Sequence, residues 1–210
     1  ISISIHNETQ TVDIKNLHYP IFFSKSIVIS RNTSEKGTTM IISSVLLFEN
    51  LTEYPLYLLK QDGIRTFSNL LVIPSNELSP LPCENSTYDF ALTTERNELT
   101  RFHDTFTIKQ IKNASILVEC IFPKNRTIKL VVSCKFNPLT CSMRVKIEPN
   151  CIIKNQLPAE LMIKPAEYNS VIRIKEGESV KSTLINAVND KFSGYFAAGN
   201  FMIDTDINPL

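Results

Sequence analysis

The chain has 210 residues, of which 43% are hydrophobic and 20% are charged, and its 22 basic and 21 acidic residues give a net charge of +1. This length accommodates about two domains of common size, and the composition is that of a folded protein rather than a disordered one. A net charge near zero, with both signs mixed along the chain, disfavours nucleic acid or an anionic membrane as an electrostatic partner.

Short segments rich in β-branched and aromatic residues follow one another, separated by Asn, Pro, Gly or Asp. Residues 1–5 alternate between apolar and polar side chains, as a strand does, and lack the features of a signal peptide. The sequence predicts further strands at 27–29, 39–42, 45–48, 56–59, 70–73, 106–108, 116–118, 128–132, 143–147 and 171–174. Many short strands with turn residues between them predict an all-β protein built from β-sandwich modules.

Helical patterns are rare, and no apolar run is long enough to cross a bilayer. Residues 179–192 have apolar spacings that a short helix could use, but a loop leading to a strand at Phe196 is an equal alternative. Because the chain has no initiator Met, we expect it to be part of a longer protein.

The second half of the chain repeats the first. Residues 46–58 align without a gap on residues 151–163, a shift of 105, and both copies consist of an apolar strand, an Asn, a short polar kink and a second apolar strand. Residues 72–78 align on 173–180, and residues 11–15 reappear as 105–109. A repeat of this length predicts two small domains, a tandem of related β-sandwich modules at 1–97 and 98–210, with the junction in the polar stretch 95–98.

Asn50 and Asn155 occupy the same position in the two copies. Asn is unusual in strands, but its side chain can bond to nearby backbone groups, so we predict that both residues are buried and structural. The alternative is an ordinary strand-ending Asn that matches by chance.

Motifs that carry enzymatic chemistry are missing: the sequence has no Gly-rich phosphate loop, no Gly-x-Ser-x-Gly, no His-Glu-x-x-His and no Cys-x-x-Cys. His103-Asp104 could form an acid–base pair, and Asp204-Thr205-Asp206 has the spacing of a metal-binding pair. We interpret both as solvated turns or loops, and the cysteines as small core residues. The sequence therefore predicts no catalytic residue, no cofactor and no metal.

Two features point to different cellular compartments. Six Asn-x-Ser/Thr sequons, at Asn7, Asn32, Asn50, Asn85, Asn113 and Asn125, are typical of a secreted glycoprotein. The five cysteines are an odd number, however, and they do not recur between the copies as a duplicated disulfide would. We therefore expect five free thiols and a cytosolic protein, with a secreted or viral glycosylated ectodomain that binds a protein receptor as the alternative.

The Asn-centred block resembles the repeats of the adaptor-binding (VAB) domain of the Vps-thirteen family of bridge-like lipid-transfer proteins. The resemblance is carried by residues 145–158, which read Val-Lys-Ile-Glu-Pro-Asn-Cys-Ile-Ile-Lys-Asn-Gln-Leu-Pro, and by the Pro-Ser-Asn-Glu-Leu-Ser-Pro-Leu-Pro segment at 74–82. Both copies carry it, so it covers nearly the whole chain. Asn50 and Asn155 match the Asn that is characteristic of this family.

The resemblance implies a cytosolic, non-catalytic scaffold that recognises short Pro-x-Pro motifs of organelle adaptor proteins and so targets a lipid-transfer protein to membrane contact sites. It also implies that neighbouring repeat modules adjoin these two, and that lipid is carried elsewhere. A proline-containing peptide suits addition to an exposed sheet edge, where half of its backbone donors would face solvent.

Overall fold

The computed structural model describes residues 2–5, 8–13, 17–23, 27–81, 87–96, 103–112, 114–122, 126–165, 171–184, 192–198 and 201–207. These residues form an all-β protein with several sheets, and one four-residue helix is found among them. Within the described ranges, no helix is long and apolar enough to cross a membrane.

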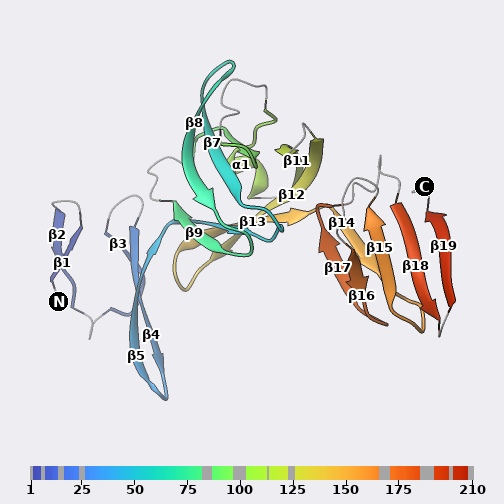
Figure 1. Ribbon diagram of the computed structural model, residues 1–210. Coiled ribbons are helices and arrows are strands. Elements are labelled where there is room, and N and C mark those ends of the chain that lie inside the picture. Colours follow the sequence, from blue (N-terminus) through green and yellow to red (C-terminus); the bar gives the residue numbers. More distant parts are fainter. Residues whose placement is uncertain are drawn as a thin grey trace.

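The elements are, in chain order, β1 Ser2–Ile5, β2 Glu8–Thr11, β3 Ile21–Phe22, β4 Ile27–Ser34, β5 Gly37–Ser44, β6 Leu46–Asn50, β7 Leu56–Gly63, β8 Thr66–Ile73, β9 Leu78–Leu81, β10 Phe90–Thr93, α1 Ile108–Ile111, β11 Ile116–Phe122, β12 Arg126–Asn137, β13 Ser142–Pro149, β14 Cys151–Lys154, β15 Leu161–Pro165, β16 Ile172–Ile174, β17 Ser179–Ser182, β18 Phe192–Ala198 and β19 Phe201–Ile207. Figure 1 shows three groups of strands along the chain.

The N-terminal group contains the hairpin β1–β2 and a three-stranded antiparallel sheet in the order β3-β4-β5. A small cluster of Val12, Leu17 and Ile29 forms its core. Figure 1 shows the β4–β5 hairpin extending well past β3, and its tip is exposed.

The central group is an eight-stranded sheet in the order β8-β7-β10-β11-β12-β13-β6-β9, which curls into a nearly closed barrel. Most neighbours are antiparallel, but β10 pairs with β11 and β13 pairs with β6 in parallel. The barrel encloses the main core of nineteen buried side chains, among them Phe48, Phe90 and Phe122. Fully burying one such side chain stabilises a fold by about 1.5–3 kcal/mol, so this core dominates the stability of the described part.

Strand alternation explains which side chains enter the barrel. In β6, Leu46, Phe48 and Asn50 are buried, while Leu47 and Glu49 between them are partly exposed. The Arg144 guanidinium on β13 donates a bidentate pair of hydrogen bonds to the Glu49 carboxylate across the outer face of the parallel pair.

The C-terminal group contains a two-stranded sheet, β14-β17, and a four-stranded sheet in the order β16-β15-β18-β19. Its described core consists of Leu161, Ile163 and Ile174, with Cys151 and Ile153 only partly buried beside them. This cluster is much smaller than the core of the barrel.

The strand predicted at 106–108 is wrong. Phe106 makes an isolated bridge to Phe90, and Thr107 then caps helix α1, because its hydroxyl accepts from the Gln110 N–H while the Gln110 side chain accepts from the Thr107 N–H. This reciprocal capping box begins a helix within a β-rich stretch. In the segment 179–192, residues 179–182 form strand β17, and residues 185–191 lie outside the described residues.

The module boundary predicted between residues 97 and 98 stays a prediction, and residue 97 and its immediate successors lie outside the described residues. Strands from both sides of this position pair within the eight-stranded sheet, at β10–β11 and at β13–β6.

Candidate functional site

Strand β8 is an end strand of the eight-stranded sheet, and its pairing with β7 is irregular. Leu58 pairs with Leu71 and Leu59 pairs with Asn69, so Leu70 is left out of the ladder. Such a β-bulge twists the strand and redirects its side chains, and bulges are common beside functional sites. The four residues 70–73 are all apolar, which is unusual for an edge strand with one solvated face.

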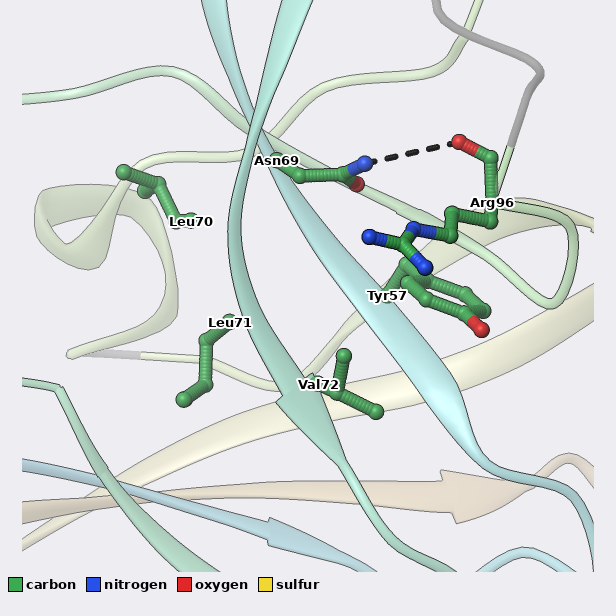
Figure 2. Close-up of a pocket in the computed structure, with 6 residues that line it drawn as sticks. All are labelled: Tyr57, Asn69, Leu70, Leu71, Val72 and Arg96. Atoms are coloured by element: carbon green, nitrogen blue, oxygen red, sulfur yellow. Dashed lines mark hydrogen bonds between the residues drawn. The ribbon is translucent and has the colours of Figure 1, made fainter.

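A shallow cavity of about 290 Å³ lies along this irregular edge. Figure 2 shows Leu70 and Leu71 on one side of the β8 ribbon, and Asn69 and Val72 on the other side with Tyr57 and Arg96. Val72 is 48% exposed although it is apolar. The lining therefore extends over both faces of the same strand edge.

Tyr57 lies on the face of β7 that points away from the barrel core. Beside it, Leu59, Phe67 and Ala91 form a small buried cluster, and Tyr57 packs at its margin. The Arg96 carbonyl accepts a 3.4 Å hydrogen bond from the Asn69 amide, which holds the segment after β10 against β8. Figure 2 shows the Arg96 side chain beside the Tyr57 ring, so an aromatic surface and a cation border the same cavity.

This arrangement can accept an extended chain. A peptide strand added beside β8 would direct alternate side chains to the Leu70–Leu71 side and to the Tyr57–Val72 side, while its backbone bonds to the strand edge. Proline rings pack well on aromatic residues, and Tyr57 provides such a surface. We name the surface formed by Tyr57, Asn69, Leu70, Leu71, Val72 and Arg96 the β8 groove.

Asn50 lies inside the barrel and fixes the end of the same strand. It is completely buried, and its side-chain amide donates to the carbonyls of Tyr54 at 2.7 Å and of Ile73, the last residue of β8, at 3.0 Å. Its side-chain oxygen accepts from the N–H of Thr52 at 2.9 Å and from the Thr52 hydroxyl at 2.7 Å. Asn50 thus joins β6, the kink and the end of β8.

Asn155 makes equivalent bonds in the C-terminal group. Its amide donates to the carbonyls of Ala159 at 2.7 Å and of Ile174, the last residue of β16, at 2.9 Å. Its side-chain oxygen accepts from the Leu157 N–H at 3.0 Å, and Asn155 is 1% exposed. Asn50 ends β6 in the eight-stranded sheet, Asn155 follows β14 in the C-terminal group, and neither lines the β8 groove.

Sequence reasoning identified the two asparagines and missed the residues of the β8 groove. The uninterrupted apolar run at 70–73 was a usable signal, because Leu70, Leu71 and Ile73 pack on the barrel core and leave the apolar Val72 exposed on the other face. The bulge and the position of Arg96 depend on pairing between distant segments, which one sequence does not reveal.

The interpretation of the histidine and acidic candidates as solvated turns or loops is wrong for His103, which is buried, and for Asp204 and Asp206, which lie in a strand. His103 is buried, and its ring packs edge-on against Phe67 at 4.9 Å. The neighbouring Asp104 carboxylate accepts from the Glu119 N–H at 3.2 Å. Asp204 and Asp206 lie in β19, and the described residues contain no group of three side chains that could hold a metal ion.

Four cysteines, Cys120, Cys134, Cys141 and Cys151, are free thiols, and Cys83 lies outside the described residues. Burial raises the pKa of the Cys120 thiol, which is enclosed in the barrel, and burial also raises the pKa of Cys134 and of Cys151. A raised pKa disfavours the thiolate and therefore nucleophilic or metal-binding chemistry at these positions.

No family model matches the chain, and no curated protein sequence matches it significantly.

Proposed function

We propose that this chain is a non-catalytic adaptor-binding scaffold of the VAB type, made of two related β-sandwich modules, which recognises an extended Pro-x-Pro segment of an organelle adaptor protein. The β8 groove is the binding surface in this proposal. The observation that carries it is an end strand whose edge is bordered on both faces by apolar side chains, with Tyr57 and Arg96 alongside. In its cell the scaffold would place a lipid-transfer protein at membrane contact sites from the cytoplasmic side.

The strand pairings support the two-module part of the proposal. β6 pairs with β9 as β14 pairs with β17, β7 pairs with β8 as β15 pairs with β16, and β7 pairs with β10 as β15 pairs with β18. The registers agree as well, since Leu56 opposite Ile73 corresponds to Leu161 opposite Ile174. In this scheme the hairpins β4–β5 and β12–β13 also correspond, because β5 and β13 both have eight residues and begin and end 105 residues apart.

The turns that follow β8 and β16 correspond too. The Glu77 N–H donates to the Pro74 carbonyl and the Glu178 N–H donates to the Lys175 carbonyl. Asn76 and Gly177 both have positive φ angles, of 56° and 74°. Asn and Gly are the residues that adopt this left-handed conformation most readily, so two different residues meet one backbone requirement.

The β8 groove suits a proline-containing ligand for two physical reasons. A proline has no N–H, and an added edge strand directs half of its backbone groups to solvent, where a missing donor costs nothing. The Tyr57 ring and the exposed Val72 side chain offer apolar surface to proline rings. Ordering a flexible peptide opposes binding, so the contact should be of moderate affinity.

Titration of a Pro-x-Pro adaptor peptide, beside a copy in which both prolines are Ala, tests the proposal. We expect the first peptide to bind and the second to bind at least about tenfold more weakly. Tyr57→Ala and Val72→Lys should each weaken binding, whereas Tyr19→Ala should not, because Tyr19 is 80% exposed on the N-terminal group. Binding should change little with salt, since one cation borders the groove.

Three results would contradict peptide docking at this groove: equal affinity for the two peptides, binding that is indifferent to both groove substitutions, or no binding of either peptide while an anionic liposome binds. Thermal melting of each variant verifies that Tyr57→Ala, which also removes packing from the cluster around Leu59, is still folded.

A glycosylated ectodomain is the less favoured alternative. Of the six sequons, Asn50-Leu51-Thr52 is accounted for by structure, because both the Asn50 amide and the Thr52 hydroxyl are buried and hydrogen-bonded. Asn32 lies on the exposed β4–β5 hairpin, and Asn7, Asn85, Asn113 and Asn125 lie outside the described residues. The intact mass of the protein from its natural source separates the two proposals, since an ectodomain should carry several glycans.

A further inference from the structure

Strand β14 has one open edge. It pairs with β17 on one side, and among the described residues no strand pairs with its other side. The Asn155 N–H, just after β14, donates to Glu178 on the β17 side. Because backbone groups alternate along a strand, those of Ile152 and Lys154 point to the open side. Ile152 is also 57% exposed, which is a large value for an Ile in a sheet.

The corresponding edge in the barrel is occupied. β6 pairs with β9 on one side and with β13 in parallel on the other, with Val145 opposite Phe48 and Ile147 opposite Asn50. With β13 on this side, the inward side chains of β6 are buried: Leu46 is 2% exposed and Phe48 is fully buried. Their counterparts on β14, Cys151 and Ile153, are only partly buried.

The counterpart of β13 is β5, and its outer edge is open as well. β5 is the last strand of the sheet β3-β4-β5, with no strand on its other side in the described part of the chain. Ile42 on β5 is 47% exposed, whereas the residue that corresponds to it, Ile147, is fully buried in the barrel. Within the described residues, the chain therefore has an open strand edge on β14 near its C-terminal end and another on β5 near its N-terminal end.

We propose that the open edge of β14 binds strand β5 of a second copy of this chain, in parallel, as β6 binds β13 within one chain. The inference uses the proposed correspondence of the two strand sets and does not depend on peptide binding at β8. The register of the barrel, transferred to the new pair, sets Thr38 opposite Cys151, Met40 opposite Ile153 and Ile42 opposite Asn155.

The contact joins different surfaces of the two copies, so it is heterologous and leaves a free edge at each end of any open assembly. It also lacks the ion pair that strengthens the barrel: Thr39 and Lys154 stand where the barrel has Arg144 and Glu49. We therefore expect a weak association that grows with concentration and does not stop at a dimer.

Sedimentation velocity of the 210-residue chain over a range of concentrations, with two substitutions, tests this. Ile42→Lys puts a charge where Ile42 would be buried, and Ile152→Pro removes an N–H from the open edge of β14 without removing a bond to β17. Each should weaken self-association at least about tenfold. Ile64→Lys is the matched control, because Ile64 is 90% exposed at the tip of the β7–β8 hairpin, and it should associate as the parent chain does.

Mixing the two variants gives a sharper result. The Ile42→Lys chain keeps a functional β14 edge and the Ile152→Pro chain keeps a functional β5, so the mixture should form a one-to-one dimer and nothing larger. A parent chain that stays monomeric at about millimolar concentration would overturn the inference, as would single variants that associate like the parent or a mixture that does not pair. The Ile42→Lys variant alone decides the matter if Ile152→Pro does not fold.

Discussion

Asn50 and Asn155 each use one side chain to bond one carbonyl and one N–H of the kink and the carbonyl of the last residue of a neighbouring strand. Such groups are costly to bury unbonded, and water is excluded from both sites. Asn50 also accepts the Thr52 hydroxyl, whereas Leu157 occupies the corresponding place near Asn155. The Asn50 side chain therefore makes one hydrogen bond more than the Asn155 side chain does.

Replacing Asn50 with Ala removes the hydrogen bonds that its side chain makes to the Ile73 carbonyl and to the Thr52 N–H in the barrel, while the Tyr54 carbonyl can still accept from the Thr52 hydroxyl. We expect the free energy of unfolding to fall by about 1–3 kcal/mol, and somewhat less for Asn155→Ala because the C-terminal core is smaller and fewer bonds are lost. Thermal melting measures the change. Asn32→Ala, at an exposed hairpin position, should melt as the parent does; melting temperatures that all three variants share with the parent would mean that these bonds contribute nothing.

At the scale of single residues, the sequence indicated which asparagines matter but not which groups they bond. The recurrence of Asn50 and Asn155 before a kink was visible in the residues. Their carbonyl acceptors at Ile73 and Ile174 lie 23 and 19 residues away in the chain, and only the strand pairing determines those contacts.

At the scale of single elements, Cys120 on β11 occupies a core position that an apolar side chain would otherwise fill. Val118, Cys120 and Phe122 face the barrel core, with Glu119 exposed between them. Burial raises the pKa of Cys120, so the folded state holds the proton more tightly than the unfolded chain does. Stability from this source is complete below the ordinary thiol pKa of about 8.5 and is lost as the pH rises above it.

The free energy of unfolding, measured by urea titration, should therefore decrease between about pH 8 and pH 10, by at most about 1.4 kcal/mol per pH unit for Cys120. Cys120→Ala should show a smaller decrease, which isolates the thiol from other groups that titrate in this range. In the native protein at pH 7.5, iodoacetamide should modify Cys141 before Cys120, since Cys141 is partly exposed and Cys120 is buried. Equal slopes in the two proteins, or early labelling of Cys120, would contradict this account.

Elements with strong local patterns were predicted correctly, and local chemistry explains the error. β4, β12 and β13 contain the β-branched runs that identified them, and β7 contains the apolar run at 56–59 with its Tyr. The short run at 106–108 has the same composition, but the capping interaction between Thr107 and Gln110 favours a helical turn there. Composition alone does not distinguish a strand from a helical turn here, because the outcome depends on a single pair of residues, Thr107 and Gln110.

For the whole molecule, the sequence predicted an all-β class and could not predict how the strands would be ordered. The barrel depends on the pairing of β13 with β6 and of β11 with β10, which bring together Ile147 with Asn50 and Ile121 with Thr93, and neither pair of residues is close in the chain. The β8 groove follows from the same ordering, since β8 is an end strand that pairs with β7 alone among the strands of the described residues. A single sequence contains no direct information about such pairings.

The overall exposure of the sequons gives a further test of this architecture. After expression in a secretory host, folded protein should carry a glycan at Asn32 and none at Asn50, because a modified Asn50 could not donate both hydrogen bonds inside the barrel. Mass spectrometry of glycopeptides measures site occupancy. A fully occupied Asn50 in monomeric protein with the parent's melting temperature would contradict the buried network.

The parallel pairing of β6 with β13 sets an order of events during synthesis. Ile147 lies opposite Asn50, 97 residues later in the chain. At about 5–20 residues per second, the ribosome needs roughly 5–20 s to deliver the second strand after the first. During that interval the β13 side of β6 has no partner strand, so Leu46 and Phe48 stay exposed along that edge. Nascent chains that already contain β6 but not yet β13 should therefore be the ones that chaperones bind most.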